Sequence, residues 1–239
     1  MTFSLFATPT WFNGIDLIFD TISLIVAFLI AGYSWKIYRL SKENKFGYFS
    51  FAFILIGLAF LTKIVTQGLV YFENWRNTAM TVLIPIVGRT TAGVNYSELF
   101  FRSGYFIFMI TMLGAWLLLF FVSQKRSGRL HRYYDVSQIA LFVYLLLLVT
   151  TVANLRYAVF YLTSSVILGM TVLNYYKNYL DTDKHSRSFL VMAAFFALTL
   201  GNLFSVFLFL NPFWYVVGEI FLLVGFLILL YTYRSITRN

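Results

Sequence analysis

Lys63 is the residue whose position most strongly implies a chemical role. It lies well inside the apolar stretch 46–72, which is long enough to cross a bilayer as a helix, since about 20 apolar residues suffice. A charge at that depth costs at least about 2.5 kcal/mol on insertion scales, and more if it is left unpaired in lipid. Lys63 therefore predicts an acidic partner, a cavity or a ligand within the membrane.

Several polar residues on other stretches are expected at a similar depth. A helix rises about 1.5 Å per residue, so depth can be counted inward from each predicted outer end. Asp20 and Lys63 both come out about 13 Å deep, with Asn202 alongside and Glu219 about 9 Å deep. Charged anchors and hydrogen-bonding groups would thus share one layer. The predicted ligand-binding residues are Lys63, Asp20, Glu219, Gln67, Asn202, Tyr105 and Thr163.

The other half of each predicted span is apolar, and the stretches 22–30, 51–61 and 220–230 contain no charge. This asymmetry predicts a polar cup that is open to the outside and closed beneath by an apolar plug. A structural alternative stays open, in which Lys63 pairs with Asp20 or Glu219 only to fix helix packing. Which acid pairs with Lys63 is also left open.

The composition argues against a soluble protein and excludes several kinds of catalytic site. Hydrophobic residues make up 60% of the 239 residues and charged residues 11%, whereas ordinary globular proteins have about 25% charged residues. The absence of cysteine excludes disulfides, thiolate metal sites and thiol catalysis. His131 and His185 lie in polar loops, which removes bis-histidine haem ligation in the membrane. We expect no metal site, no catalytic residues and no enzyme activity.

The elements that must position these residues are membrane helices. We predict an all-α, polytopic seven-helix bundle that forms a single domain over residues 1–239. The connection 73–97 would be an outer loop, with TVLIPIV as a strand, hairpin or re-entrant segment. The predicted spans are 11–38, 46–72, 98–123, 137–154, 156–178, 188–210 and 213–233.

The basic residues predict the orientation. Most of the 18 Lys and Arg fall in the loops after the first, third and fifth spans and in the C-terminal tail. Cytoplasmic loops carry such an excess, so the N-terminus is expected outside and the C-terminus in the cytoplasm. The same distribution accounts for the net charge of +9, so we do not expect the protein to bind nucleic acid. The protein is expected in a cell membrane as a multi-pass protein, and the lack of a basic N-terminal leader suits a prokaryotic plasma membrane.

Short matches in three spans resemble the microbial rhodopsins. Arg102 lies in the outer part of the third span, and Arg156-Tyr157 is followed by Phe160 and Thr163-Ser164. In the seventh span Glu219 is followed by Leu223, Gly225 and Phe226, which is similar to the family's acid, Schiff-base lysine and Gly-Phe pattern.

The resemblance implies the seven-helix fold and an outward-biased pocket, but not light-driven pumping. Leu223 stands where the retinal-binding lysine would be, so no covalent Schiff base would form there. Tyr105 stands at the position of the primary acidic counter-ion, and Trp116 where pumps often place a proton donor.

The leading functional hypothesis is a receptor-like membrane sensor that binds a small ligand or a non-covalent chromophore in the outer pocket. Lys63 would anchor a carboxylate there, and the signal would pass through the basic loops to a cytoplasmic partner. A membrane-protein partner or a second copy of the chain is a further candidate partner. The alternatives are a structural or accessory subunit of a larger membrane complex, and a small-solute transporter or channel. The sequence does not specify a cofactor.

Overall fold

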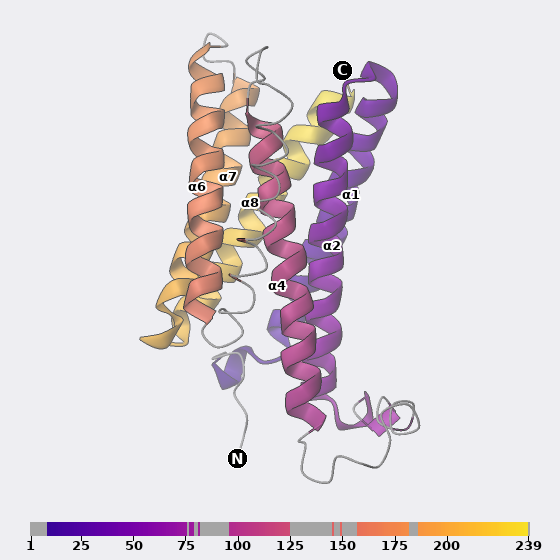
Figure 1. The fold of residues 1–239 in the computed structure, drawn as a ribbon, viewed down its shortest axis with the longest axis vertical. Coiled ribbons are helices and arrows are strands. Elements are labelled where there is room, and N and C mark those ends of the chain that lie inside the picture. The colour runs from indigo at the N-terminus through magenta and orange to yellow at the C-terminus, as the bar shows by residue number, and fades with distance from the viewer. Residues whose placement is uncertain are drawn as a thin grey trace.

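The structure, a computed structural model, describes residues 9–75, 77–78, 81, 96–124, 145, 149, 157–181 and 186–238. Each element with defined bounds is a helix, and the long helices run side by side along the molecule (Figure 1). In chain order they are η1 (Thr10–Phe12), α1 (Ile15–Ser41), α2 (Asn44–Tyr71), α4 (Tyr96–Ser123), α6 (Tyr157–Asp181), α7 (Ser186–Val206), η2 (Phe207–Phe209) and α8 (Phe213–Arg238).

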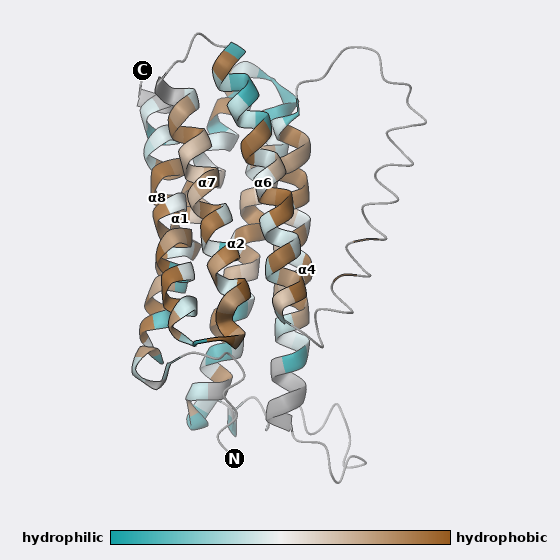
Figure 2. Ribbon diagram, turned by 90° about the vertical axis from the view of Figure 1, so that its left-hand side faces the viewer, coloured by the Kyte–Doolittle hydropathy of each residue, from teal (hydrophilic) through white to brown (hydrophobic). Residues whose placement is uncertain are grey.

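Six of these helices are long and apolar enough to cross a membrane, namely α1, α2, α4, α6, α7 and α8. Brown, which marks hydrophobic residues, covers most of the length of these helices (Figure 2). Their outward surfaces expose large apolar side chains such as Ile25, Leu173 and Leu227, which water would disfavour and lipid accepts. The prediction of an all-α, polytopic membrane protein is therefore confirmed.

The remaining predicted segments lie largely outside the described residues. Of the span 137–154, only residues 145 and 149 are described, and both are helical. Of the outer loop 73–97, residues 73–75, 77–78 and 81 are described as helical, and α4 begins at Tyr96. The predicted strand, hairpin or re-entrant segment TVLIPIV falls outside the described residues except for Thr81.

Short turns join α1 to α2 and α7 to α8 as antiparallel pairs. Lys42 ends α1 in the left-handed conformation, with φ of 58°, and its backbone N–H donates to the Tyr38 carbonyl at 2.8 Å. This arrangement is a common way to terminate a helix. Between α7 and α8, the Asn211 side chain accepts a hydrogen bond from the Phe213 N–H at 2.8 Å, ahead of the first turn of α8. Asn211 and Pro212 thus lie in the turn between the predicted spans 188–210 and 213–233.

Helices α4 and α6 run parallel to one another. Near their starts, the Tyr105 and Tyr157 rings lie 4.9 Å apart between centroids. Near their ends, the Asn174 amide donates to the Ser123 hydroxyl at 2.9 Å. The end of α4 and the start of α6 therefore lie at opposite ends of the bundle (Figure 1).

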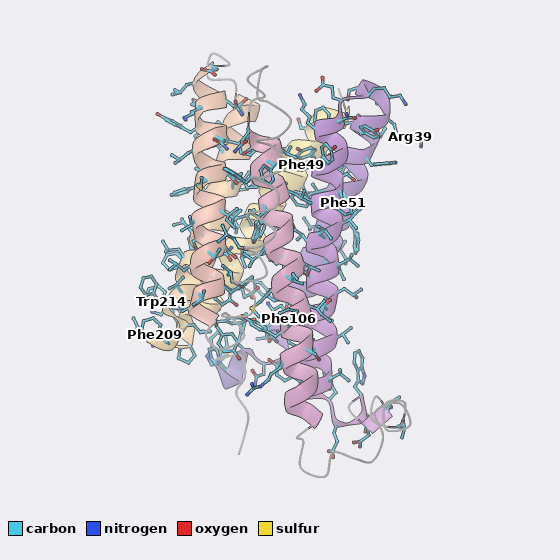
Figure 3. The ribbon with its side chains drawn as sticks, viewed as in Figure 1. Arg39, Phe49, Phe51, Phe106, Phe209 and Trp214 are labelled. Atoms are coloured by element: carbon cyan, nitrogen blue, oxygen red, sulfur yellow. The ribbon has the colours of Figure 1, made fainter. Side chains whose placement is uncertain are left out.

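The two ends of the bundle differ in chemistry. We call the end at which α1, α4, α6 and α8 begin the cluster end, because the buried charges lie toward it. The opposite end, the basic end, carries Arg39, Lys42 and Lys45 at the α1–α2 turn. Figure 3 shows Arg39 at the basic end and Phe209 and Trp214 at the cluster end.

Aromatic side chains fill the bundle between the buried charges and the basic end. The Phe226 ring contacts Phe53, Phe60 and Trp116, with centroids 6.3, 5.6 and 6.4 Å away. All four side chains are essentially inaccessible. This packing is the apolar plug that the sequence predicts.

Candidate functional site

The Lys63 ammonium group is bound by two carboxylates from two other helices. Its Nζ atom donates to Asp20 Oδ1 of α1 at 2.8 Å and to Glu219 Oε1 of α8 at 2.7 Å. The three side chains are 3%, 0% and 6% exposed, so the charges are withdrawn from solvent. We call Asp20, Lys63 and Glu219 the charge cluster. Both acids that the sequence left as alternatives are partners of Lys63.

A second set of hydrogen bonds surrounds Asp16, one turn before Asp20 on α1. Asp16 Oδ2 accepts from the Tyr71 hydroxyl at 2.8 Å and from Gln67 Nε2 at 3.2 Å. Its Oδ1 accepts from the backbone N–H groups of Gly14 and Leu17 at 2.8 and 2.9 Å. Four donors, together with a place in the first turn of a helix, suit an ionised carboxylate.

Aromatic rings enclose the charge cluster. Lys63 Nζ lies 5.4 Å from the Tyr215 ring centroid and 6.0 Å from that of Phe108, both at cation–π distance. Tyr161 also reaches the site from α6. The sequence reasoning missed Tyr71, Tyr161 and Tyr215. Helical spacing could have found two of them, because Tyr71 lies two turns after Lys63 and Tyr215 one turn before Glu219.

A small cavity of about 10 Å³ lies beside Lys63 and Glu219. This volume suits about one water molecule, and polar groups are available to bind it. The lining combines these two charged residues with Asn202, Tyr161 and a mainly apolar wall. The lining residues are Phe60, Lys63, Phe108, Met112, Phe160, Tyr161, Asn202, Glu219 and Leu222.

The other predicted site residues lie at different distances from the charge cluster. Asn202 lines the cavity, although its amide donates to the Leu198 carbonyl of its own helix at 3.0 Å. Gln67 bonds Asp16 rather than Lys63. Tyr105 is buried against α6, and Thr163 donates within α6 to Val159 at 2.8 Å. Thr163 and Tyr105 do not line the cavity.

The site is closed toward the cluster end, unlike the open cup that the sequence predicts. A small apolar group covers it there, formed by Phe12, Leu208, Tyr215 and Val216. The Phe12 ring, just before α1, packs on Phe19 and Tyr215 with centroids 5.7 and 6.2 Å away. Gly14 makes this possible, because its φ of 91° is a conformation that other residues rarely adopt.

Some buried polar atoms at the site lack hydrogen-bond partners within the described chain. They include Asp20 Oδ2, Gln67 Oε1 and the Tyr215 hydroxyl. Asp20 is the most consequential of the three, because its other oxygen already binds Lys63. Among the described residues, no group of three or more His, Cys, Asp or Glu side chains is arranged to hold a metal ion.

Comparisons with protein-family models, with curated proteins and with solved structures find no match to this chain. The chemistry of the site therefore rests on its own geometry. The arrangement can hold a charged or hydrogen-bonding group against Lys63, and it can bind protons on closely spaced carboxylates.

Proposed function

We propose that the protein is a receptor-like membrane sensor that binds a small ligand in the polar layer around Lys63. The observation that carries this proposal is the charge cluster, in which one buried lysine joins α1, α2 and α8. A ligand carboxylate that binds Lys63 would replace Asp20 or Glu219. The exchange would release α1 or α8 from α2, and the helices would carry the change to the basic end.

The energetics of buried ion pairs support a role beyond stability. Replacing a buried ion pair by well-packed apolar residues is often neutral, or stabilising by about 1–4 kcal/mol. Fold stability alone therefore gives little reason to keep three charges in the membrane. Intramembrane ionisable residues more commonly serve binding or transfer.

The small cavity is consistent with a protein that has two arrangements. A space of about 10 Å³ holds no ligand larger than water, so a larger ligand requires the surrounding helices to separate. Binding would then favour a second arrangement over the closed one described above. A ligand with different affinities for the two arrangements shifts their populations, which is how a sensor reports.

Native mass spectrometry of protein purified in mild detergent from its own host tests this proposal. We expect the wild-type protein to carry a bound non-lipid mass, and Lys63→Met to lose it. A visible absorption spectrum of the same samples would identify a chromophore. Lys45→Met is the matched control, since Lys45 is exposed and paired with Glu43 at the basic end.

Two results would refute the sensor proposal. One is a wild-type protein that carries no such mass across preparations that retain its fold. The other is a folded Lys63→Met protein that carries the same mass at the same occupancy. In either case the charge cluster would be a structural element that fixes three helices.

We further propose that the bundle has seven spans, with 137–154 as the additional one and the N-terminus outside. The parallel course of α4 and α6 supports the extra crossing, because Ser123 and Tyr157 lie at opposite ends. Val149, from the second half of that stretch, packs against the main core. The basic end would then face the cytoplasm. The likeness to microbial rhodopsins stays a hypothesis that rests on its short sequence matches.

Single cysteines test this topology cleanly, because the chain has none of its own. In intact cells, a membrane-impermeant maleimide should label Asn154→Cys and Asn211→Cys. It should label Ser41→Cys and Ser127→Cys only after lysis. Labelling of positions 127 and 154 from the same side would exclude the additional span, and the reverse pattern at 41 and 211 would invert the orientation.

A further inference from the structure

We propose that the charge cluster binds one proton near neutral pH, shared by the Asp20 and Glu219 carboxyl groups. This inference is independent of the sensor proposal. It starts from the charge count: two carboxylates face one ammonium group, so the fully ionised cluster has one negative charge too many. An uncompensated buried charge is costly enough that the group usually becomes neutral instead.

Among the residues that the structure describes, the groups around the cluster supply no further positive charge. The titratable residues that face it are Asp16 on α1, Tyr105 on α4, Tyr161 on α6 and Tyr215 on α8, and α7 contributes the neutral Asn202. Among the described residues, Lys63 is the buried cation and Asp16 the nearest additional acid. Asp16 adds negative charge rather than removing it, which strengthens the case for a proton.

The hydrogen bonds place the proton on Asp20 or Glu219 rather than on Asp16. In all four hydrogen bonds to Asp16, the Asp16 carboxyl group is the acceptor. An ionised carboxylate can accept more hydrogen bonds than a carboxylic acid, which must also donate one. Asp20 Oδ2, by contrast, is fully buried and receives no donor from the described chain. Asp20 Oδ1 and Glu219 Oε1 both lie within hydrogen-bond distance of one Nζ atom, and two carboxylates that share a site rarely ionise together.

A bound proton makes the cluster responsive to changes in its partners. With one proton, the cluster contains one ammonium group, one carboxylate and one carboxylic acid, and it is neutral. A ligand carboxylate that replaced Asp20 or Glu219 at Lys63 would bring one more negative charge into the cluster and leave the displaced acid without its cation. Binding of such a ligand should therefore take up about one additional proton from solution.

Infrared spectroscopy of the purified protein in ester-free detergent tests this directly. The C=O stretching band of a carboxylic acid, identified by its shift in heavy water, reports each protonated carboxyl group. We expect one such group in the wild-type protein at neutral pH. We expect none in Asp20→Asn or in Glu219→Gln, because each leaves a one-to-one ion pair with Lys63. We expect twice the wild-type band area in Lys63→Met.

The matched controls are Glu43→Gln, an exposed acid at the basic end, and Asp16→Asn, and both should retain the wild-type band. A wild-type protein without the band would overturn the proposal, as would a band that survives in both Asp20→Asn and Glu219→Gln. A band lost only in Asp16→Asn would also overturn it. If Lys63→Met does not fold, the two single-acid variants still decide the result, because each keeps a neutral ion pair.

Discussion

Removing the Lys63 charge should destabilise the protein through the two acids that it leaves behind. Lys63→Met keeps most of the side-chain volume but deletes hydrogen bonds of 2.8 and 2.7 Å to Asp20 and Glu219. Breaking a buried ion pair by removing one partner typically costs about 3–5 kcal/mol, because the other partner remains buried and uncompensated. Proton binding by the two acids reduces this cost, so we expect Lys63→Met to lower the free energy of unfolding by about 3 kcal/mol at neutral pH.

The cost should depend on pH in a defined direction. The folded variant should bind two protons at Asp20 and Glu219 where the wild-type cluster binds one, so a falling pH should stabilise the variant more than the wild-type protein, and the difference between them should shrink. Removing the acids together with the lysine should have the same effect at neutral pH. The variant Lys63→Met/Asp20→Leu/Glu219→Leu should therefore recover most of the lost stability.

Unfolding by a denaturing detergent, followed by circular dichroism, measures these differences. Lys45→Met is the control, and we expect it to cost no more than about 1 kcal/mol because exposed ion pairs contribute little. If Lys63→Met is within about 1 kcal/mol of wild type at neutral pH, the cluster is not the tightly coupled ion network described above. A deficit that grows as pH falls would contradict the reasoning as well.

Further substitutions, near the cluster and at the basic end, test the packing of the bundle. Gly104→Ala should cost about 1–3 kcal/mol, because the added methyl group would overlap the Thr66 hydroxyl, and Thr66→Ala in the same chain should restore part of the loss. Asp16→Ala should cost about 1–2 kcal/mol by removing acceptors at the start of α1, measured by the same unfolding assay. Asn174→Ala, which deletes the 2.9 Å bond to Ser123, should cost about 1 kcal/mol and leave proton binding unchanged. A loss in Asn174→Ala as large as that in Lys63→Met would show that the assay reports general helix packing.

The charge cluster was within reach of sequence reasoning for a physical reason. Charges within a membrane must find partners, and the fixed rise of a helix gives the depth of each residue. Asp20, Lys63 and Glu219 could therefore be assigned to one layer. That both acids bind the same ammonium group follows from the three-dimensional packing, which depth alone does not contain.

The residues that were wrongly assigned to the site or missed show that depth alone does not determine which side chains reach it. Thr163 and Tyr161 lie at nearly the same depth, but two residues along a helix are about 200° apart in rotation. Tyr161 faces the cavity, whereas Thr163 satisfies its hydroxyl on the Val159 carbonyl. Rotation depends on how each helix packs on its neighbours, and the uniformly apolar surfaces of membrane helices give a weak signal for it.

The prediction of an open cup was wrong for a related reason. The apolar group that covers the site includes Phe12, which lies just before α1 and packs on Tyr215, far away in the chain. A contact between two apolar side chains so distant in sequence leaves no periodic pattern. The plug beneath the cluster was predictable, because uncharged stretches recur at the same depth in several spans.

The close approach of α7 to α8 links two walls of the cavity mechanically. A methyl group on Gly201 would lie 2.8 Å from the Gly218 carbonyl, so the two backbones touch where those residues cross. Asn202 and Glu219 directly follow these two glycines in the chain. A tilt of α8 that draws Glu219 away from Lys63 would therefore carry Asn202 with it, and the lysine would lose one of its two acidic partners and a neighbouring amide in a single rigid-body step.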